Sequence, residues 1–493
     1  MAVQTPEWVK DAVFYQIFPD RFARSRRVPK PANLEPWDSP PTAHGFKGGD
    51  LLGVAEKLDY LQDLGITAIY FTPVFASAAN HRYHTCDYRA VDPILGGNQA
   101  LRELIDRAHS RGIRVVLDGV FNHAGRGFYQ FNHALENGAA SPYLDWFHFD
   151  LKRLKAGRPL GAYPRGGGPG RLGYRAWWDL PALPKLNTKT PAVREFIFGV
   201  AEHWVRFGID GWRLDVPFEI DDDSFWREFR RRVKAADPQA YIVGEIWGEA
   251  GRWLQGDQFD AVMNYLFAKA VLAYFCDRLD LAELQGTTGY RMVRPFDQRR
   301  FTAAMGRLLG LYDPAVALSQ LNLLDSHDTP RFLTLARGDE TALRLAATLM
   351  FTFPGAPCIY YGDEIGMEGG RDPDCRRTFP WDRRRWNRGL RDFFQRLIRL
   401  RRAQPCLRRG SFELLHSRDD VYAFRRRLGR ESLAVLLNLG RKDRTVSIEL
   451  PGLGPRRAVF REVWGKGAHA ASQGRLAGLR LAPRSSLILR GHN

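Results

Sequence analysis

Apolar residues at helical spacing alternate along this chain with short runs of β-branched and aromatic residues. Apolar positions within 54–61 precede Gly65, and the apolar run 68–71 follows at once. The same order recurs around Gly112 and Gly208. Residues spaced i, i+3, i+4 and i+7 mark the buried face of a helix, and glycine supplies its left-handed C-cap. Helices that alternate with short buried strands predict a parallel sheet with crossover helices.

Eight strand-and-helix units of this kind indicate an α/β fold, a closed (β/α)8 TIM barrel. A doubly wound open sheet is the alternative, but the chain has no GxGxxG turn to favour one. The predicted strands are 13–18, 68–71, 115–117, 212–214, 241–246, 261–265, 318–324 and 358–361.

Two segments depart from this pattern. The interval between Gly112 and Gly208 is about twice that between Gly65 and Gly112, and the excess lies at 123–187. A long structureless loop is improbable in a compact domain, so we expect a small inserted domain or lid there, containing the glycine-rich run 166–170. The barrel would then comprise residues 1–122 and 188–404.

The last segment, 405–493, changes to short alternating strands without helices between them. This pattern predicts a C-terminal all-β sandwich domain. The strands are expected at 412–415, 421–425, 432–438, 446–450 and 487–489.

The cysteines and the apolar segments of the chain indicate in which cellular compartment the protein is expected. Five cysteines are scattered without a CxxC pair, which argues against a disulfide framework and a structural zinc site. We find no apolar run of transmembrane length and no secretory signal at the N-terminus, so we expect a cytoplasmic protein that does not bind a membrane.

The net charge of +18 raises the possibility of nucleic-acid binding. Arginine is spread along most of the chain, however, and no nucleic-acid-binding motif accompanies it. The densest basic run, 376–409, is interleaved with apolar residues and predicts an amphipathic helix with a solvated basic face. We therefore expect no nucleic-acid partner.

Polar residues follow several of the predicted strands where they end. In a barrel of parallel strands these ends meet at one face, where functional residues collect. One such residue could belong to a buried ion pair, but packing alone does not explain four strands that end this way. They are Asp118, Asn122 and His123 after the third strand, Arg213 and Asp215 on the fourth, Glu245 after the fifth, and Asp325, His327 and Asp328 after the seventh.

Three carboxylates at one face suggest glycosidic bond cleavage, in which one acid protonates the departing oxygen and a second carboxylate attacks or activates water. Arg213 lies two residues before Asp215, so both side chains point to the same face, and the guanidinium would keep Asp215 ionised. Glu245 needs a raised pKa to carry a proton. His123 and His327 can donate hydrogen bonds to sugar hydroxyls.

A dinuclear metal hydrolase is the alternative chemistry. Asp118, Asn122 and His123 could ligate a metal, but the chain has no HxH or HExxH pair. We therefore favour a glycosidase with no metal and no cofactor.

At these residues the sequence resembles the α-amylase family of glycoside hydrolases. Four of its ordered blocks are present: DGVFNH at 118–123, GIDGWRLDV at 208–216, GEIW at 244–247 and LLDSHD at 323–328. The resemblance implies Asp215 as nucleophile, Glu245 as general acid/base and Asp328 as the third carboxylate. It also implies that Arg213, His123 and His327 contact substrate and that Tyr83 stacks on it.

Three further blocks resemble the neopullulanase, cyclomaltodextrinase and maltogenic amylase group: LPKLN at 183–187, GDQFDAVMNY at 256–265 and GGRDPDCRR at 369–377. Within the last block, Asp372 and Arg376 fall where the group contacts sugar further from the cleavage point. The resemblance implies hydrolysis of α-1,4 and sometimes α-1,6 bonds in maltodextrins, cyclodextrins or pullulan.

The chain departs from this group at four places. The barrel pattern begins almost at residue 8, without the group's N-terminal β domain, so we expect a monomer or a dimer not built by such a domain. The group's calcium-binding loop is replaced by the basic segment 24–30, where we expect no calcium. His84 and Gly248 stand where the group often has Asp and His.

Two alternatives remain on the same scaffold. A 4-α-glucanotransferase or other transglycosylase would use the same covalent intermediate with a sugar as acceptor. A catalytically inert binding relative is disfavoured, because Asp215, Glu245 and Asp328 are all present.

Overall fold

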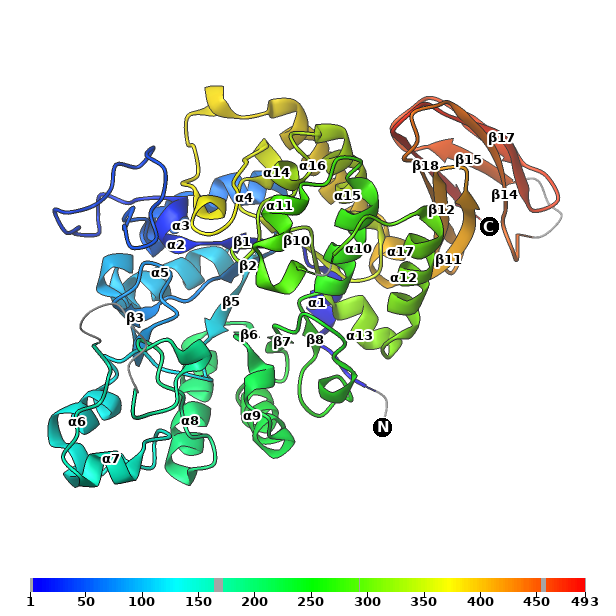
Figure 1. The fold of residues 1–493 in the computed structure, drawn as a ribbon. Helices are drawn as coiled ribbons and strands as arrows, with labels where there is room; N and C mark the ends of the chain where they lie inside the picture. The colour runs from blue at the N-terminus through cyan, green and yellow to red at the C-terminus, as the bar shows by residue number, and fades with distance from the viewer. Residues whose placement is uncertain (1–2, 164–171, 292, 454–457, 493) are drawn as a thin grey trace.

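The structure, a computed structural model, describes residues 3–163, 172–291, 293–453 and 458–492. Eight parallel strands pair in the order β8-β7-β6-β5-β2-β1-β10-β9, and a parallel bridge between Met263 and Leu321 joins the two ends. The predicted barrel is therefore confirmed (Figure 1). Its strands are β1 (Phe14–Ile17), β2 (Ala68–Phe71), β5 (Arg114–Gly119), β6 (Gly211–Leu214), β7 (Tyr241–Gly244), β8 (Ala261–Val262), β9 (Leu321–Leu323) and β10 (Ala356–Tyr360).

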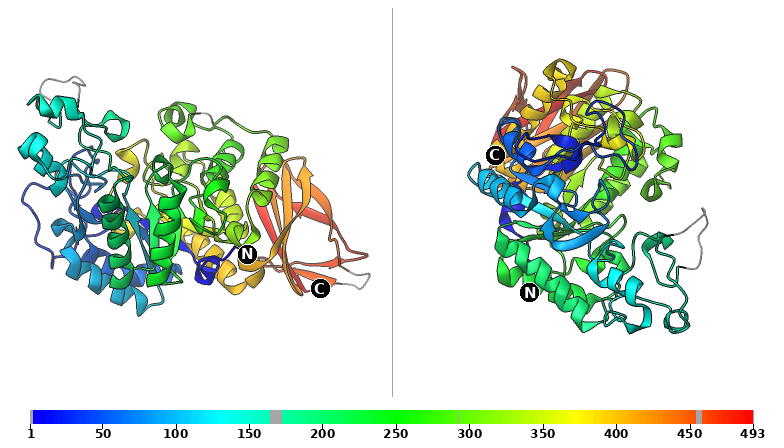
Figure 2. Two further views of the ribbon diagram at one scale, coloured as in Figure 1. Left: turned by 90° about the horizontal axis from the view of Figure 1, so that it is seen from below. Right: turned by 90° about the vertical axis from the view of Figure 1, so that its left-hand side faces the viewer.

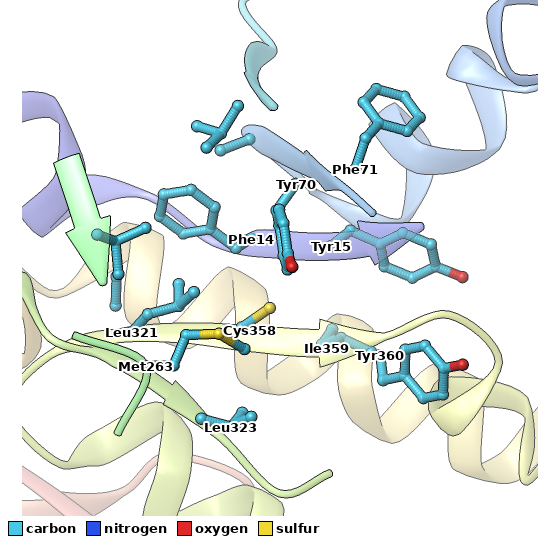
Figure 3. Close-up of a cluster of buried hydrophobic side chains, with 14 of the residues drawn as sticks. Phe14, Tyr15, Tyr70, Phe71, Met263, Leu321, Leu323, Cys358, Ile359 and Tyr360 are labelled. Carbon is cyan, nitrogen blue, oxygen red and sulfur yellow. The ribbon is translucent and has the colours of Figure 1, made fainter. Parts of the chain in front are cut away.

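Side chains fill the interior of the barrel. Phe14 on β1 pairs in register with Ala68 on β2 and with Cys358 on β10. Figure 3 shows Phe14, Tyr70, Met263 and Cys358 directed toward one another, and all four are buried. The closed, packed base leaves the carboxyl ends of the strands as the place where the chain can form a site.

Helices surround the barrel, and two of the three predicted glycine caps are confirmed, whereas α5 is capped by Ser110, two residues before Gly112. Gly65 ends α4 with φ 100°, and Gly208 ends α8 with φ 112°. None of the helices in the described part of the chain is long and apolar enough to cross a membrane. The helices outside 123–187 are α1 (Glu7–Asp11), α2 (Pro19–Phe22), α3 (Leu51–Glu56), α4 (Leu58–Leu64), α5 (Gly97–His109), α8 (Pro191–Phe207), α9 (Asp223–Ala236), α10 (Tyr265–Phe275), α11 (Leu281–Gln285), α12 (Gln298–Gly310), α13 (Pro314–Ser319), α14 (Phe332–Leu335), α15 (Glu340–Thr352), α16 (Arg388–Ala403) and α17 (Pro405–Arg409).

The segment between β5 and α8 carries α6 (Tyr129–Asn137) and α7 (Leu151–Lys155), and its aromatic side chains pack together in a cluster continuous with the barrel core. The Phe131 ring centroid lies 5.0 Å from that of Phe147 and 4.9 Å from that of Tyr174. Residues 166–170 lie outside the described residues. A β3 (Phe75–Ser77) and β4 (Thr85–Val91) hairpin precedes the segment and was not predicted, because β3 is too short to show a period.

The C-terminal all-β domain is confirmed. A six-stranded sheet, ordered β11-β12-β13-β18-β15-β16, and the pair β14–β17 enclose a separate core. The domain lies at the end of the barrel opposite α6 and α7 (Figures 1 and 2). Its strands are β11 (Ser411–Arg418), β12 (Val421–Leu428), β13 (Glu431–Asn438), β14 (Arg444–Glu449), β15 (Ala458–Glu462), β16 (Ala468–Ala471), β17 (Arg475–Leu481) and β18 (Ser485–His492).

Helix α16 corrects one expectation about the basic run. The helix is amphipathic as predicted, with Arg388, Arg396, Arg399 and Arg402 exposed, but Arg401 is fully buried. The Arg401 guanidinium donates hydrogen bonds to the backbone carbonyls of Gly355 at 2.7 Å and Leu407 at 3.2 Å. Arg401 therefore links α16 to the backbone at Gly355 and Leu407, because backbone carbonyls accept the hydrogen bonds that the buried guanidinium donates.

Candidate active site

A pocket of about 1060 Å³ lies at the carboxyl ends of the barrel strands. Six of the nine predicted site residues line it, while Arg213, His123 and His327 lie behind its wall. The lining residues are His81, Tyr83, His84, Trp177, Trp178, Leu180, Leu183, Asp215, Val216, Phe218, Glu245, Trp247, Glu283, Gly286, Thr287, Gly289, Asp328, Gly370, Arg371, Asp372, Asp374 and Arg376.

The strand ladder fixes the positions of Asp215 and Glu245. The two residues follow β6 and β7, and their amides continue the ladder, donating to Gly119 O at 3.1 Å and to Leu214 O at 3.0 Å. Val216, the next residue after Asp215, has a φ of 35°, which is costly for a β-branched side chain. Its amide donates to Glu245 Oε2 at 2.9 Å, so the turn aims a backbone donor at that carboxylate.

One guanidinium lies among three carboxylates. Arg213 is fully buried, and its Nη1 donates to Asp118 Oδ1 at 2.9 Å and to Asp215 Oδ1 at 3.0 Å. Its Nη2 lies 3.1 Å from Glu245 Oε2. The sequence predicted the contact with Asp215, but Arg213 shares its single positive charge among all three acids.

Burial raises the pKa of the three acids, and the shared charge of Arg213 opposes the rise. Burial raises the pKa of Asp215 well above its ordinary value, and the negative charges of Glu245 and Asp118 oppose its ionisation further, while Arg213 lowers it. Burial also raises the pKa of Glu245, with Arg213 opposing and Asp328 adding to the rise. The raised pKa of Glu245 has the direction that a general acid needs.

Asp328, in the loop after β9, is placed between a cation and a histidine. Its Oδ1 lies 3.4 Å from Arg376 Nη2, and its Oδ2 lies 3.1 Å from His327 Nε2. Arg376 Nη1 also lies 3.0 Å from Asp372 Oδ1. Arg376 thus links two pocket carboxylates, Asp328 and Asp372.

The side chains of His327 and Tyr83 contact each other and fix each other's orientation. Their rings stack with centroids 5.5 Å apart, and the Tyr83 hydroxyl is hydrogen-bonded to His327 Nε2. The other ring nitrogen, Nδ1, is 2.7 Å from Gln16 Nε2. The Tyr83 hydroxyl also lies 3.0 Å from Asp118 Oδ2, so Asp118 orients both the tyrosine and Arg213.

His123 lies beneath the pocket surface. Its Nε2 is 3.2 Å from the carbonyl oxygen of Tyr83, and its ring stacks on Trp177 with centroids 5.1 Å apart. Burial lowers the pKa of His123 to about 3, so the ring is neutral. The resemblance implied a substrate contact, whereas in this structure His123 supports Tyr83 and Trp177.

The structure adds His81 and Glu283, which were not singled out from the sequence, to the residues that line the pocket. His81 lies beside His84, with ring centroids 4.9 Å apart, and burial lowers the pKa of His84 to about 4. Glu283 and Arg371 form an ion pair at the rim, with Oε2 and Nε 3.4 Å apart. No sequence pattern marks His81 or Glu283, because the β3–β4 loop and helix α11 that carry them come together only in the folded chain.

Comparisons with known proteins identify the family of the chain. The model of the alpha amylase catalytic domain matches residues 16–395, and a domain of unknown function (DUF3459) matches residues 407–488. The chain belongs to the alpha-amylase family. It is 44% identical to neopullulanase 2 of Thermoactinomyces vulgaris over 98% of this chain and 78% of that protein.

Two solved structures are similar to this chain over nearly their whole length. Ttha1563 from Thermus thermophilus is 50% identical with a TM-score of 0.90, covering 98% of this chain and 99% of that one. The debranching enzyme of Nostoc punctiforme, in its native form, is 48% identical with a TM-score of 0.88, covering 99% of this chain and 100% of that one.

Within residues 24–30, where we expect no calcium, Lys30 forms an ion pair with the carboxylate of Asp50. The Lys30 ammonium lies 2.9 Å from Asp50 Oδ2, which is fully buried, and donates to Ile94 O at 2.7 Å. Asp50 also accepts from the amides of Ser25 and Gly53, at 2.8 Å and 2.7 Å. Among the described residues, no group of three His, Cys, Asp or Glu side chains could hold a metal ion.

We predict that Lys30, and no bound ion, stabilises this loop. Lys30→Met should lower the free energy of unfolding by about 2 kcal/mol, because it leaves the buried Asp50 carboxylate without its cation. Chemical denaturation measures this, with the exposed Lys155→Met as control. EDTA should leave the wild-type melting temperature unchanged, and a drop of several degrees would refute the prediction.

We also predict an acid limb in the pH profile caused by Asp118. Burial raises its pKa to about 6, with Arg213 opposing, so protonation on acidification weakens its bonds to Arg213 and Tyr83. The kcat/KM should fall below pH about 6, and Asp118→Asn should lower kcat/KM about 10- to 100-fold and flatten this limb. Because the folded pKa lies above the ordinary value near 4, Asp118 costs stability progressively as pH rises from about 4 to 6.

Proposed function

We propose that this alpha-amylase family member is a retaining α-glucan hydrolase that cleaves α-1,4 and also α-1,6 glucosidic bonds in maltodextrins, cyclodextrins or pullulan. The observation that carries the proposal is the pair Asp215 and Glu245, held on Nη1 and Nη2 of one guanidinium. Adjacent nitrogens of Arg213 favour the short carboxylate separation of a retaining enzyme over the wider one that an inverting enzyme needs for water.

In the first step Glu245 gives its proton to the glycosidic oxygen, whose bond to the anomeric carbon breaks. Asp215 forms the new bond to that carbon, which yields a covalent glycosyl-enzyme of inverted configuration. In the second step Glu245 takes a proton from water, the water oxygen bonds to the anomeric carbon, and Asp215 leaves as a carboxylate. Two inversions give net retention.

The remaining site residues bind and orient the sugar in this proposal. Asp328 presents a carboxylate, fixed by Arg376 and His327, to hydroxyls of the glucosyl unit undergoing reaction. Tyr83 offers a ring face to the same unit, while Arg213, His327 and His123 hold the groups that touch it. Asp372 and Arg376 would contact the chain further from the cleaved bond.

Product analysis tests the proposal directly. Wild-type enzyme should release maltose, glucose or panose from maltotriose, β-cyclodextrin and pullulan, and fresh products should carry the α configuration by NMR. The variant Asp215→Asn should release none of them. Longer oligosaccharides accumulating from maltotriose would move the assignment to a glucanotransferase, and products of β configuration would exclude the retaining mechanism.

The proposal also covers the cofactor, the partner, the cellular compartment and the domains of the enzyme. The chemistry uses side chains alone, so no cofactor is needed, and the substrate oligosaccharide is the partner. Five free cysteines suit the reducing cytoplasm. We propose residues 1–122 and 188–404 as the catalytic barrel, 123–187 as the inserted lid domain and 405–493 as the C-terminal domain, in a monomer or a dimer that needs no N-terminal domain.

A further inference from the structure

A further cavity lies at the end of the barrel opposite the catalytic carboxylates. Its volume is about 400 Å³, within the range of about 300–1,000 Å³ typical of small-molecule sites. It lies at the amino ends of β2 and β5, and α1, α16 and α17 contribute the rest of its wall. Its lining is rich in arginine and contains a single acid: the residues are Trp8, Asp11, Thr67, Gly112, Arg114, Arg402 and Arg408.

The acids on α1 are outnumbered by the cations around them. Asp11 accepts hydrogen bonds from Arg408 Nη1 and from Arg409, whose Nη2 donates to Asp11 Oδ2 at 2.8 Å. Glu7 Oε2 lies 3.4 Å from Arg409 Nη2, and Glu7 also pairs with Lys10. Two carboxylates thus face three cations, so a net positive charge remains at this wall of the cavity.

Two other donors at the cavity are unused within the part of the chain that the structure describes. Arg402 is exposed, and its guanidinium forms no ion pair and no hydrogen bond among those residues. The Thr67 hydroxyl accepts from the Val13 amide at 2.9 Å, which leaves its own proton to donate. Arg114 is instead neutralised by Asp210, with Nη1 and Oδ1 2.7 Å apart. An anion in the cavity would therefore meet free donors from two separate elements.

Two buried guanidinium groups near Arg408 add positive charge. Arg401 and Arg426 are fully buried, and among the described residues their hydrogen bonds go to backbone carbonyls and to no carboxylate. Burial, together with the positive charges of Arg426 and Arg408, lowers the pKa of Arg401 to about 9. Cations that lie among other cations are stabilised by an anion nearby. The charge behind the cavity thus favours the same kind of ligand as its lining.

We propose that this cavity binds a phosphate dianion, carried by inorganic phosphate or by a phosphorylated sugar, through Arg402, Arg408 and the Thr67 hydroxyl. Guanidinium groups form strong, charge-assisted hydrogen bonds with phosphate oxygens. The ligand gives part of the basic run 376–409 a role, and it connects α16 and α17 to the start of β2. Because the cavity lies at the other end of the strands from the active site, this inference does not depend on the proposed function.

Isothermal titration calorimetry with inorganic phosphate tests the proposal, at about pH 8 and with the ionic strength held constant by sodium chloride. Wild-type protein should bind one phosphate per chain. Arg402→Met should raise the Kd about 10-fold or more, because it removes a charge-assisted hydrogen bond. Asp11→Asn should lower the Kd about 3-fold or more, because it removes the acid that lines the cavity.

A parallel titration with glucose 1-phosphate distinguishes the two sources of the phosphate group. A Kd about 10-fold or more below that of inorganic phosphate, and raised by Arg402→Met, identifies a phosphorylated sugar, for which the cavity has room beside Trp8. Equal or weaker binding of glucose 1-phosphate identifies inorganic phosphate as the ligand.

Arg399→Met is the matched control, because Arg399 is exposed on the same helix as Arg402 but does not line the cavity. It lowers the net charge of the protein by the same amount and should leave the Kd for phosphate unchanged. Wild-type protein that binds no phosphate overturns the site. Equal losses of affinity in Arg402→Met and Arg399→Met also overturn it, because they would mean that phosphate is attracted only by the overall positive charge of the chain.

Discussion

Asp215→Asn is expected to lower kcat on maltotriose by at least about 10⁴-fold, the largest effect predicted for any substitution in this chain. The amide cannot form the glycosyl-enzyme, so the remaining groups can only bind and polarise the substrate. The amide remains within reach of Arg213, which keeps Asp118 and Glu245 as partners, so the shape of the pocket is preserved. Substrate binding, measured by isothermal titration with maltotriose, should therefore persist.

The same substitution is expected to maintain or raise stability. Burial raises the pKa of Asp215, so ionising this carboxyl at pH 7 costs more free energy in the folded state than in the unfolded chain. Asparagine removes that cost, and the melting temperature at pH 7 should equal or exceed that of wild type. Asp221→Asn, at an exposed carboxylate paired with Arg252, is the control and should keep full activity. A variant at Asp215 that retains substantial activity would exclude Asp215 as the nucleophile.

The barrel could be predicted because each unit repeats the same local signals. Gly208 is an example: a left-handed cap follows the buried stripe of α8, and β6 must begin directly afterwards. Once the strands were placed, Asp215 and Glu245 had to lie at one face, since parallel strands end on the same side. That argument needs no knowledge of distances between strands.

What could not be predicted depends on how separate strands and loops meet. Asp118 pairs in register with Arg213 across β5 and β6, and this register brings the guanidinium to three acids. Arg213 therefore does not simply ionise Asp215, as its position two residues away suggested. The β17 strand was missed for a local reason, because Gly478 at φ 68° interrupts the alternation of its apolar residues.

Trp178 illustrates a different limit of the sequence. Its position in the sequence does not distinguish it from a core aromatic, whereas in the structure Trp178 and Asp179 have positive φ values and the indole is exposed. A non-glycine residue in that region carries no compositional signal, because the energy that holds it comes from tertiary contacts. His123 shows the reverse case: a histidine expected at the substrate is buried behind an aromatic stack.

Glu245→Gln should separate the two chemical steps. Glutamine cannot donate the proton that a sugar leaving group needs, so kcat on maltotriose should fall about 10³- to 10⁴-fold. Fluoride leaves without protonation, so α-maltosyl fluoride should still react with Asp215. The second step then lacks its base, and the glycosyl-enzyme should accumulate, giving a burst of fluoride and an added maltosyl mass on the peptide that contains Asp215.

Glu245→Gln also alters the two hydrogen bonds that the Glu245 carboxylate accepts. Oε2 accepts from the Val216 amide and Oε1 from Trp247 Nε1 at 3.0 Å, so glutamine can keep only one of these two acceptors. The lost hydrogen bond costs about 1–3 kcal/mol, while removal of a buried acid with a raised pKa offsets part of that cost. Folding should therefore survive, with the exposed Glu249→Gln as the fully active control. Steady turnover of α-maltosyl fluoride without a burst would mean that another group serves as the base, whereas a trapped adduct on Asp215 assigns both roles in a single experiment.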